Sequence, residues 1–333
     1  MINIIMFDTK ESEQVFLDKL MFSDFKITFF KEKLDETTKL TVKEYDETSI
    51  LSIFITSKIN GKVLDKFKNL RIIVTRSVCY SHIDIEECRK RNIAVINAEN
   101  YGAVSVSQYV AGLIFILTRK IFLSANNIKE EKNIFENYQG NNIDKYSIGV
   151  IGTGSIGQEV CKIAHLLGMK IFAYDIKINE SIKDFVEYVT FTDLLRKSDI
   201  VTLHIPYISE CKHMFSFQEF EIMKNGSFFI NTSQGDFINY SALHKALVNS
   251  KISGAALDII WEDCNYNFDE PNKKPNYEEL EKLFICQKIM KMNNVIITPR
   301  IAYNTTESLN NILVSNFNNI RNYFKGIKTN RIV

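Results

Sequence analysis

Three glycines with the spacing G-x-G-x-x-G constrain this chain most: Gly152, Gly154 and Gly157 in the segment IGTGSIG. They follow an apolar, strand-like run from Ser147 to Ile151 and precede a helix-like run from Gln158 to Leu167. In such a turn the first glycine permits the sharp bend, the second lets the backbone approach a pyrophosphate, and the third lets helix and strand pack closely. The segment therefore predicts a dinucleotide site. The alternative is a glycine-rich turn in an unrelated sheet.

An acidic residue stands where such a site needs one. Asp175 ends the next strand-like run, KIFAYD, about 20 residues past the glycines, where a carboxylate accepts the ribose hydroxyls. An acid at this point repels a 2′-phosphate, so the sequence predicts NAD rather than NADP, with Lys177 as the one nearby cation that would soften this choice. The alternative for Asp175 is a solvated acid at a strand end.

Short Ile- and Val-rich runs alternate with amphipathic stretches along most of the chain, which is typical of buried parallel sheets in an α/β protein. The 333 residues, 45% of them apolar, favour two domains. The predicted strands are 3–7, 50–56, 71–75 and 94–96, followed by 147–151, 170–174, 200–203, 227–231, 254–258 and 295–298. The predicted helices of the first half are 11–20, 61–67 and 84–90. Helical patterns at 103–120 and 305–324 predict linker helices. If the second returns to the first domain, that domain is discontinuous, and a cleft between domains is the expected ligand site.

Composition excludes several classes of partner. The 41 Lys and Arg nearly cancel the 40 Asp and Glu, which argues against nucleic acid or an anionic membrane and favours a small-molecule ligand. No apolar run approaches the roughly 18 residues that span a bilayer. The six cysteines show no zinc-like spacing, so we expect reduced thiols, no metal site and a soluble, cytoplasmic protein.

Further segments resemble the D-isomer-specific 2-hydroxyacid dehydrogenases, closest to the bacterial D-lactate dehydrogenase branch. These segments are TRSVCYSHID (75–84), ENYGAVSVSQ (99–108), SDIVTLHIP (198–206), MKNGSFFINTSQGDFINYSALHKALVNSKISGAALD (223–258) and NVIITPRIAYNTT (294–306). The resemblance implies two Rossmann-like, doubly wound parallel-sheet domains. Residues 1–100 and 300–333 would form a flavodoxin-like catalytic domain, residues 101–299 would bind NAD, and the protein would be a homodimer.

The resemblance also assigns site residues. Ser155 and Ile156 would lie at the pyrophosphate, and Ile205 and Pro206 by the adenosine ribose. Toward the nicotinamide it places Thr232, Ser233, Gln234 and Asp258. Tyr101 and Val78 would contact the substrate carboxylate, and the alternative for Tyr101 is an aromatic side chain on a domain surface.

The catalytic positions depart from the family. Its enzymes use Arg to hold the substrate carboxylate, His as the acid and Glu to orient that acid; here NTSQG puts Gln234 at the arginine position and TPR puts Arg300 at the histidine position. The glutamate position falls on Asp263, beside Glu262. A guanidinium with a pKa of about 12 or more cannot donate a proton at neutral pH, so Arg300 cannot act as the acid that histidine provides in the family.

Three hypotheses follow from these exchanges. In the first, the cation has moved to Arg300, held by Asp263, and the enzyme reduces a different 2-oxo acid with Tyr303, Tyr101 or water as proton donor. In the second, the chain binds NAD without turnover, as a redox sensor or partner subunit. In the third, it is a decayed paralogue. The five histidines are expected to be packed or solvated rather than catalytic.

Overall fold

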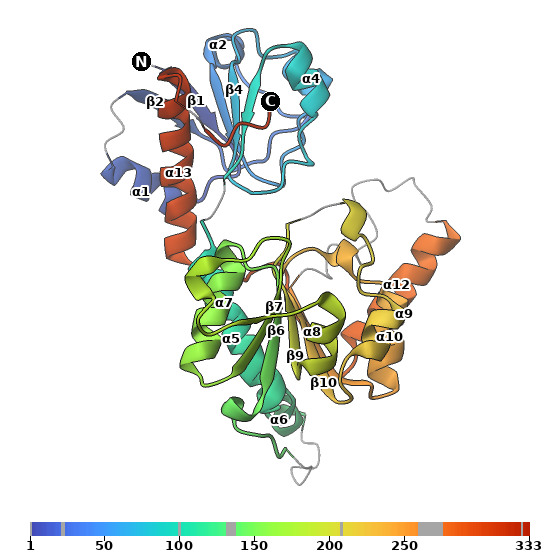
Figure 1. The fold of residues 1–333 in the computed structure, drawn as a ribbon. Coiled ribbons are helices and arrows are strands. Elements are labelled where there is room, and N and C mark those ends of the chain that lie inside the picture. The colour runs from blue at the N-terminus through green and yellow to red at the C-terminus, as the bar shows by residue number, and fades with distance from the viewer. Residues whose placement is uncertain are drawn as a thin grey trace. The chain divides into compact units, whose positions relative to one another are not determined.

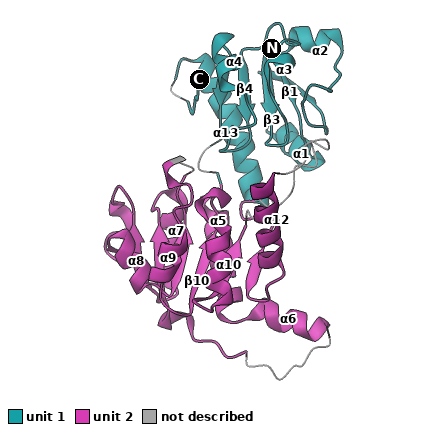
Figure 2. Cartoon of the chain, turned by 90° about the vertical axis from the view of Figure 1, so that its right-hand side faces the viewer, with its two compact units in different colours: residues 1–101, 304–333 teal, residues 102–303 magenta. Residues whose placement is uncertain are grey.

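The structure is a computed structural model that describes residues 2–20, 24–98, 101–130, 138–206, 209–258, 276–327 and 329–333. It divides into two compact units (Figure 2). The smaller unit comprises residues 1–101 and 304–333, and the larger unit comprises residues 102–303. Each is built on its own parallel sheet, which confirms the predicted α/β class with two doubly wound domains.

The smaller unit contains a five-stranded parallel sheet in the order β2-β1-β3-β4-β5. Its strands are β1 (Ile2–Met6), β2 (Phe25–Phe29), β3 (Ile50–Ile53), β4 (Ile72–Thr75) and β5 (Ala94–Ile96). Its helices are α1 (Glu11–Lys19), α2 (Val42–Glu47), α3 (Gly61–Leu64), α4 (Ile85–Lys90) and α13 (Thr306–Phe324). All residues of β3, β4 and β5 are buried, which explains why these strands are apolar runs without alternation.

The C-terminal helix α13 belongs to this N-terminal unit, as Figure 1 shows by its red ribbon beside the blue β1. Leu313, Phe317 and Ile320 of α13 are buried in one apolar cluster with residues of β1 and β4. The chain end then pairs with β5, because Ile332 N donates to the Val95 carbonyl at 2.8 Å. A helix from the far end of the sequence thus covers one face of the sheet.

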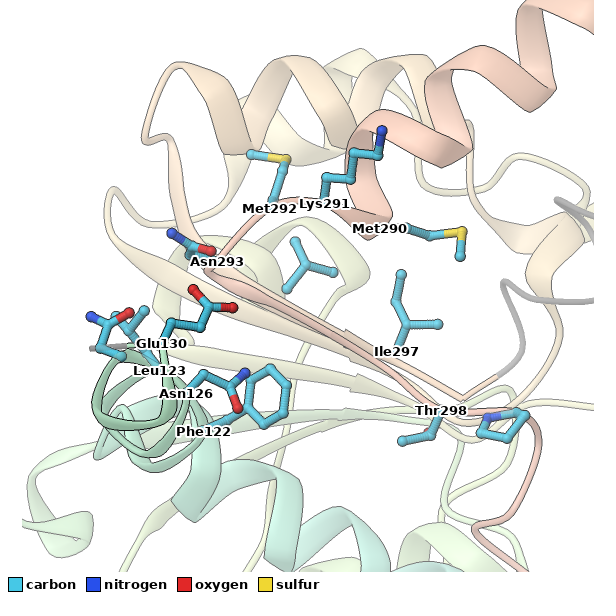
Figure 3. Close-up of a pocket in the computed structure, with 13 residues that line it drawn as sticks. Phe122, Leu123, Asn126, Glu130, Met290, Lys291, Met292, Asn293, Ile297 and Thr298 are labelled. Carbon is cyan, nitrogen blue, oxygen red and sulfur yellow. The ribbon is translucent and has the colours of Figure 1, made fainter. Parts of the chain in front are cut away.

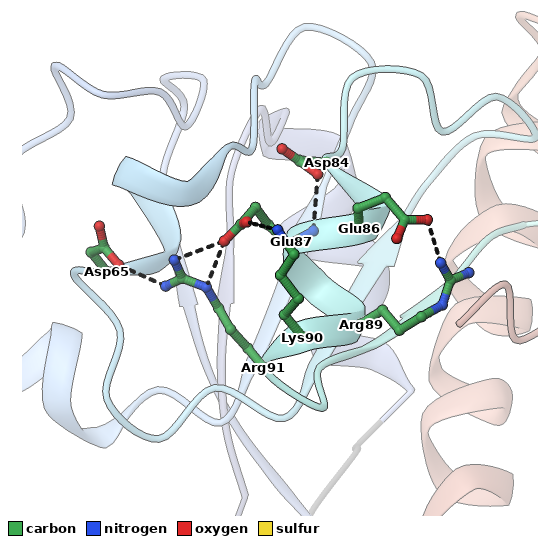
Figure 4. Close-up of polar contacts among 7 residues, drawn as sticks. All are labelled: Asp65, Asp84, Glu86, Glu87, Arg89, Lys90 and Arg91. Atoms are coloured by element: carbon green, nitrogen blue, oxygen red, sulfur yellow. Dashed lines mark hydrogen bonds and ion pairs between the residues drawn. The ribbon is translucent and has the colours of Figure 1, made fainter.

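Surface ion pairs reinforce the short helix α4 (Figure 4). Asp84 caps its first turn by accepting from Glu87 N at 3.0 Å, and the Glu87 carboxylate pairs with Lys90 at 2.8 Å and Arg91 at 3.1 Å. Arg91 also reaches Asp65 at 2.7 Å, which ties α4 to the segment that follows α3. Exposed ion pairs of this kind stabilise a helix only weakly, so this network makes a small contribution to α4.

The larger unit contains a seven-stranded parallel sheet in the order β12-β11-β10-β9-β6-β7-β8. Its strands are β6 (Ser147–Ile151), β7 (Lys170–Tyr174), β8 (Glu187–Tyr188), β9 (Ile200–Leu203), β10 (Ser227–Asn231), β11 (Ile252–Leu257) and β12 (Val295–Ile297). Its α-helices are α5 (Ala103–Thr118), α6 (Ile121–Lys129), α7 (Ser155–Leu166), α8 (Phe191–Lys197), α9 (Phe217–Ile222), α10 (Tyr240–Val248) and α12 (Tyr277–Met290). Two apolar clusters, one containing α5 and α7 and the other α8, α9, α10 and α12, fill the space between helices and strands.

The sequence analysis gave no bounds for the strands β2 and β8 or for the helices α2, α6, α8, α9, α10 and α12. β2 and β8 lie at sheet edges, where a strand needs no continuous apolar run. The predicted helix 103–120 ends at Thr118, because Lys120 adopts a left-handed conformation with φ 51° and α6 starts after it.

No single helix in the described ranges is long and apolar enough to cross a membrane, although α5 and α6, bent by 63°, reach the required length and composition together. Of the cysteines, Cys79, Cys88, Cys161 and Cys211 are free. Cys286 of α12 is disulfide-bonded, so the expectation of reduced thiols is wrong for this residue.

A candidate dinucleotide site at the carboxyl edge of the larger sheet

The strand register brings six chain segments to one level of the sheet. Ile151 of β6 lies opposite Tyr174 of β7 and Leu203 of β9, and the row continues across the other strands. Its further members are Asn231 of β10, Leu257 of β11 and Ile297 of β12. The residues that follow this row therefore emerge together at the carboxyl edge, where open parallel sheets bind their ligands. The predicted cofactor residues of this unit all belong to these segments.

The glycine turn has the shape that a pyrophosphate requires. Gly152 has φ +89°, and a Cβ there would lie 2.5 Å from the carbonyl oxygen of His204. A Cβ on Gly157 would overlap the carbonyl oxygen of Gly152, whereas a Cβ on Gly154 would meet nothing within 4 Å. Gly154 is the N-cap of α7 and offers no capping side chain, so the first N–H groups of the helix, including those of Ser155 and Ile156, face the open side. The residues present fit a dinucleotide phosphate.

Asp175 is fixed beside this turn. Its Oδ2 accepts from the Thr153 backbone N–H at 2.6 Å and from the Thr153 hydroxyl at 3.1 Å. Its Oδ1 accepts from Lys177 N at 3.1 Å. The carboxylate predicted to bind the ribose therefore lies at the glycine turn, and Lys177 contacts it through its backbone.

The segments after β9 and β10 lie on the other side of the turn. Ile205 is half-buried and its side chain lines Gly152, while Pro206 is exposed. Ser233 is anchored, since its hydroxyl donates to the Leu203 carbonyl at 2.8 Å. The Thr232 hydroxyl is buried and has no hydrogen-bond partner in the described part of the chain, so a bound ligand would be its natural partner.

The carbonyl of Gln234 accepts from Asn231 Nδ2 at 2.8 Å, and Gln234 is half-buried. Its backbone is thereby held at the same edge of the sheet. Gln234, which the resemblance places at the family's arginine position, therefore carries a neutral amide and lies in the segment predicted to approach the nicotinamide.

Asp258 organises the turn that carries Arg300. Its buried carboxylate accepts from the Thr298 hydroxyl at 2.5 Å, from Ile301 N at 3.0 Å and from Ala302 N at 2.8 Å. Burial raises the pKa of Asp258, although these hydrogen bonds and the charge of Arg300 act against the increase. Arg300 itself has φ +54°, and its N–H donates to the Asp258 carbonyl at 2.7 Å. A non-glycine residue in this region is strained and indicates a position that the surroundings enforce.

The remaining predicted residues do not all fall in this unit. Val78 and Tyr101 belong to the smaller unit, where Val78 is 53% exposed at the carboxyl end of β4. Tyr303 is at the end of the larger unit and packs, partly buried, on the α5 cluster. Asp263 lies outside the described residues.

His204 is buried and His82 is half-buried, and both are neutral. Burial lowers the pKa of His204 to about 3, and its Nε2 lies 3.0 Å from the Thr202 hydroxyl. Burial likewise lowers the pKa of His82 to about 4, and its Nε2 lies 3.1 Å from the Thr75 hydroxyl. Neither is protonated at neutral pH, which agrees with the expectation that they are packed rather than catalytic.

Sequence reasoning missed three residues that contact the site. Thr153, the middle residue of the first G-x-G, donates a hydrogen bond to Asp175. Tyr188 of β8 donates to the Thr153 hydroxyl, and the Asn179 side chain donates to the Thr153 carbonyl. The only signal in the sequence for these contacts was a hydroxyl residue, Thr153, at the variable position of the first G-x-G.

A pocket of about 560 Å³ lies between α6 and the segment from Met290 to Pro299 (Figure 3). Phe122, Asn126 and Glu130 of α6 face Met290 and the edge strand β12 across it. Thr298 and Pro299 form its end nearest to Arg300, but none of the predicted site residues lines it.

Comparison with known proteins matches these observations. Residues 111–302 fit the family profile "D-isomer specific 2-hydroxyacid dehydrogenase, NAD binding domain". The chain is 32% identical to an aromatic 2-oxoacid reductase of Clostridium sporogenes, with 87% of each chain covered. It is 33% identical to a D-specific alpha-keto acid dehydrogenase of Enterococcus faecium, with 78% of each covered.

Among solved structures, the fold resembles D-lactate dehydrogenase from Aquifex aeolicus in complex with NAD and lactic acid. The TM-score is 0.78 at 27% identity, covering 97% of this chain and 96% of the other. The profile match and the fitting glycine turn show that the cofactor is NAD. With matches that span most of its length, the chain belongs to the D-isomer-specific 2-hydroxyacid dehydrogenase family.

Proposed function

We propose that the protein is an NADH-dependent reductase of a 2-oxo acid whose active site is rearranged around Arg300. The observation that carries this proposal is the strained Arg300 backbone, held in place by the buried Asp258. A left-handed arginine costs about 1–2 kcal/mol, and such a cost persists where the residue has a task. The relatives named aromatic 2-oxoacid reductase and D-specific alpha-keto acid dehydrogenase support the substrate class.

Along the carboxyl edge of the sheet, different residues would bind different parts of NADH. The N–H groups of Ser155 and Ile156 bind the pyrophosphate, and Asp175 accepts from the ribose. Ile205 and Pro206 lie beside the adenosine ribose, while Thr232, Ser233 and Gln234 approach the nicotinamide together with the Asp258 segment. Bound NADH supplies the hydride that reduces the substrate carbonyl.

Arg300 would bind the substrate carboxylate, since its guanidinium presents paired donors that match a carboxylate. Gln234 donates only neutral hydrogen bonds and cannot carry this charge. Asp263 would orient Arg300, and Val78 and Tyr101 are further residues that would contact the substrate carboxylate. The proton for the alkoxide would come from Tyr303, Tyr101 or water, because a guanidinium holds its proton at neutral pH.

Turnover with a panel of 2-oxo acids tests this proposal. The protein should oxidise NADH with at least one member of the panel, and Arg300→Gln should abolish that activity. Arg321→Gln, a change to an arginine that pairs with Asp24 on the surface of the smaller unit, is the matched control and should leave turnover unchanged. Turnover by Arg300→Gln at the parent rate would refute the role of Arg300.

A second candidate function is NAD binding without turnover, as in a redox sensor or partner subunit. The specific observation in its favour is that two family catalytic positions carry Gln234 and Arg300 while the glycine turn remains complete. This candidate predicts calorimetric binding of NADH with no oxidation across the panel. If Gln234→Arg together with Arg300→His created activity, the chain would have lost an ancestral site.

We further propose that the protein is a cytoplasmic homodimer. Helix α6 exposes Ile121, Phe122 and Ile128, which are 49%, 46% and 65% exposed, and a second copy would bury them. Light scattering of the purified chain should give twice the monomer mass. Phe122→Glu should shift it to the monomer, and a parent protein that is monomeric would contradict the proposal.

A further inference from the structure

A chain of directed hydrogen bonds ends on the ribose-binding acid. Asn179 N–H donates to the Tyr188 hydroxyl at 3.0 Å, and that hydroxyl donates to Thr153 Oγ1 at 3.0 Å. The Thr153 hydroxyl in turn donates to Asp175 Oδ2 at 3.1 Å. Because a backbone N–H only donates, a carboxylate only accepts and each hydroxyl has one hydrogen, both hydroxyl hydrogens must point toward Asp175.

Thr153 connects the two halves of the cofactor site. Its side chain is buried, its N–H donates to Asp175 at 2.6 Å, and its carbonyl accepts from Asn179 Nδ2 at 2.9 Å. The residue between the first two glycines of the phosphate turn is therefore bonded to the loop after β7 through its backbone and its side chain. Neither the turn nor the acid can shift without the other.

The number of hydrogen bonds that the Asp175 carboxylate already accepts shows how many acceptor positions remain for a ligand. Oδ2 accepts two hydrogen bonds, both from Thr153, and Oδ1 accepts one, from Lys177 N. A carboxylate offers about four acceptor positions, so one position on Oδ1 is left over within the described ranges. The relay holds Oδ2 on Thr153 and leaves Oδ1 with an acceptor position for a ligand.

We infer that Thr153 and Tyr188 are positioning residues that fix the Asp175 carboxylate and so set the preference for NAD over NADP. A carboxylate free to rotate about its side-chain bonds would swing away from a 2′-phosphate and tolerate it. A carboxylate held through Oδ2 keeps its negative charge where the 2′-phosphate would lie. The selectivity of the site then depends on the two hydroxyl groups behind Asp175 as well as on the acid itself.

Calorimetry of the full chain with NADH and with NADPH tests this inference through the ratio of the two dissociation constants. Thr153→Val keeps the shape of the side chain and removes the hydroxyl. We expect it to weaken NADH binding about fivefold to tenfold, to leave NADPH binding unchanged, and so to lower the ratio by the same factor. Tyr188→Phe should lower the ratio about threefold, since it acts one bond further away.

Two matched variants complete the design. Thr153→Ser retains the hydroxyl and should keep the parent ratio. Tyr146→Phe removes a phenol hydroxyl of the same unit that accepts a long hydrogen bond from Asn141 Nδ2, at 3.4 Å, and should also keep the parent ratio. Because the readout is binding, the result does not depend on whether the protein turns over.

The inference is overturned if Thr153→Val and Tyr188→Phe, shown to be folded by thermal unfolding, keep the parent ratio. It is equally overturned if both cofactors lose affinity by the same factor, because the residues would then only stabilise the turn.

Discussion

Replacement of Arg300 by glycine should give a more stable protein than replacement by glutamine, and both variants should lose the proposed function. Arg300 has φ +54°, a conformation that costs an L-residue about 1–2 kcal/mol and costs glycine nothing. Glycine also loses more backbone entropy on folding, about 0.5–1 kcal/mol. The hydrogen bond from the backbone N–H of residue 300 to the Asp258 carbonyl, 2.7 Å long, does not involve the side chain and remains. Because glycine and glutamine both remove the attraction between the Arg300 guanidinium and the Asp258 carboxylate, only the backbone terms differ, and the glycine variant should be more stable than the glutamine variant by about 0.5–1 kcal/mol.

Urea unfolding measures this difference, and thermal unfolding should give a midpoint about 1–4 °C higher for Arg300→Gly than for Arg300→Gln in a unit of this size. Arg300→Gln is the matched variant, because it removes the guanidinium and keeps the Cβ that makes the conformation strained. Both variants should lose the binding of a 2-oxo acid in the presence of NADH. If Arg300→Gln were as stable as Arg300→Gly, or more stable, the argument from strain would be refuted.

Three further predictions concern the larger unit. Gly157→Ala should abolish NADH binding in calorimetry, because its Cβ would overlap the carbonyl oxygen of Gly152; retained binding would contradict the proposed turn geometry. Asp258→Asn should cost about 2–4 kcal/mol in urea unfolding, since its amide would direct hydrogens at groups that already donate, and a change below about 0.5 kcal/mol would show that the turn does not depend on the carboxylate. Burial raises the pKa of Asp199, but the hydrogen bonds from Lys224 and Ser147 and the charge of Lys224 together outweigh it and the pKa is lowered, so the stabilisation is present at neutral pH and is lost as the pH falls through that lowered pKa. Asp199→Asn should therefore cost about 1 kcal/mol at neutral pH and progressively less below a pH of about 4, and a loss independent of pH would contradict this.

The sequence predicts the buried centre of both sheets because a strand buried on both faces is a continuous apolar run. The run from Arg71 to Thr75 corresponds to β4, and the run from Ser147 to Ile151 corresponds to β6. It does not predict β2 or β8, because polar and exposed positions interrupt their apolar pattern, whereas the edge strands β5 and β12 are apolar throughout and were predicted. The end of α5 was also missed, since the left-handed Lys120 has no local signal such as glycine.

In the candidate site, too, residues required by local backbone geometry are predictable from the sequence, and contacts between distant segments are not. Gly152, Gly154 and Gly157 are predictable because each is required by a local backbone geometry. The hydrogen bonds behind Asp175 are not, since Tyr188 and Thr153 are 35 residues apart and meet only when β8 pairs with β7. Asp258 was predicted to approach the nicotinamide, whereas its carboxylate is bonded to a turn about 40 residues later in the chain.

A single-turnover experiment tests the central claim most directly. The protein, in excess over NADH so that all cofactor is bound, is mixed with the 2-oxo acids of the panel, and the NADH absorbance is followed. The proposed function predicts complete oxidation of the bound NADH by the parent protein with at least one acid, and none by Arg300→Gln. Bound NADH that stays reduced with every acid would contradict the proposal and leave the chain as an NAD-binding protein without this reaction.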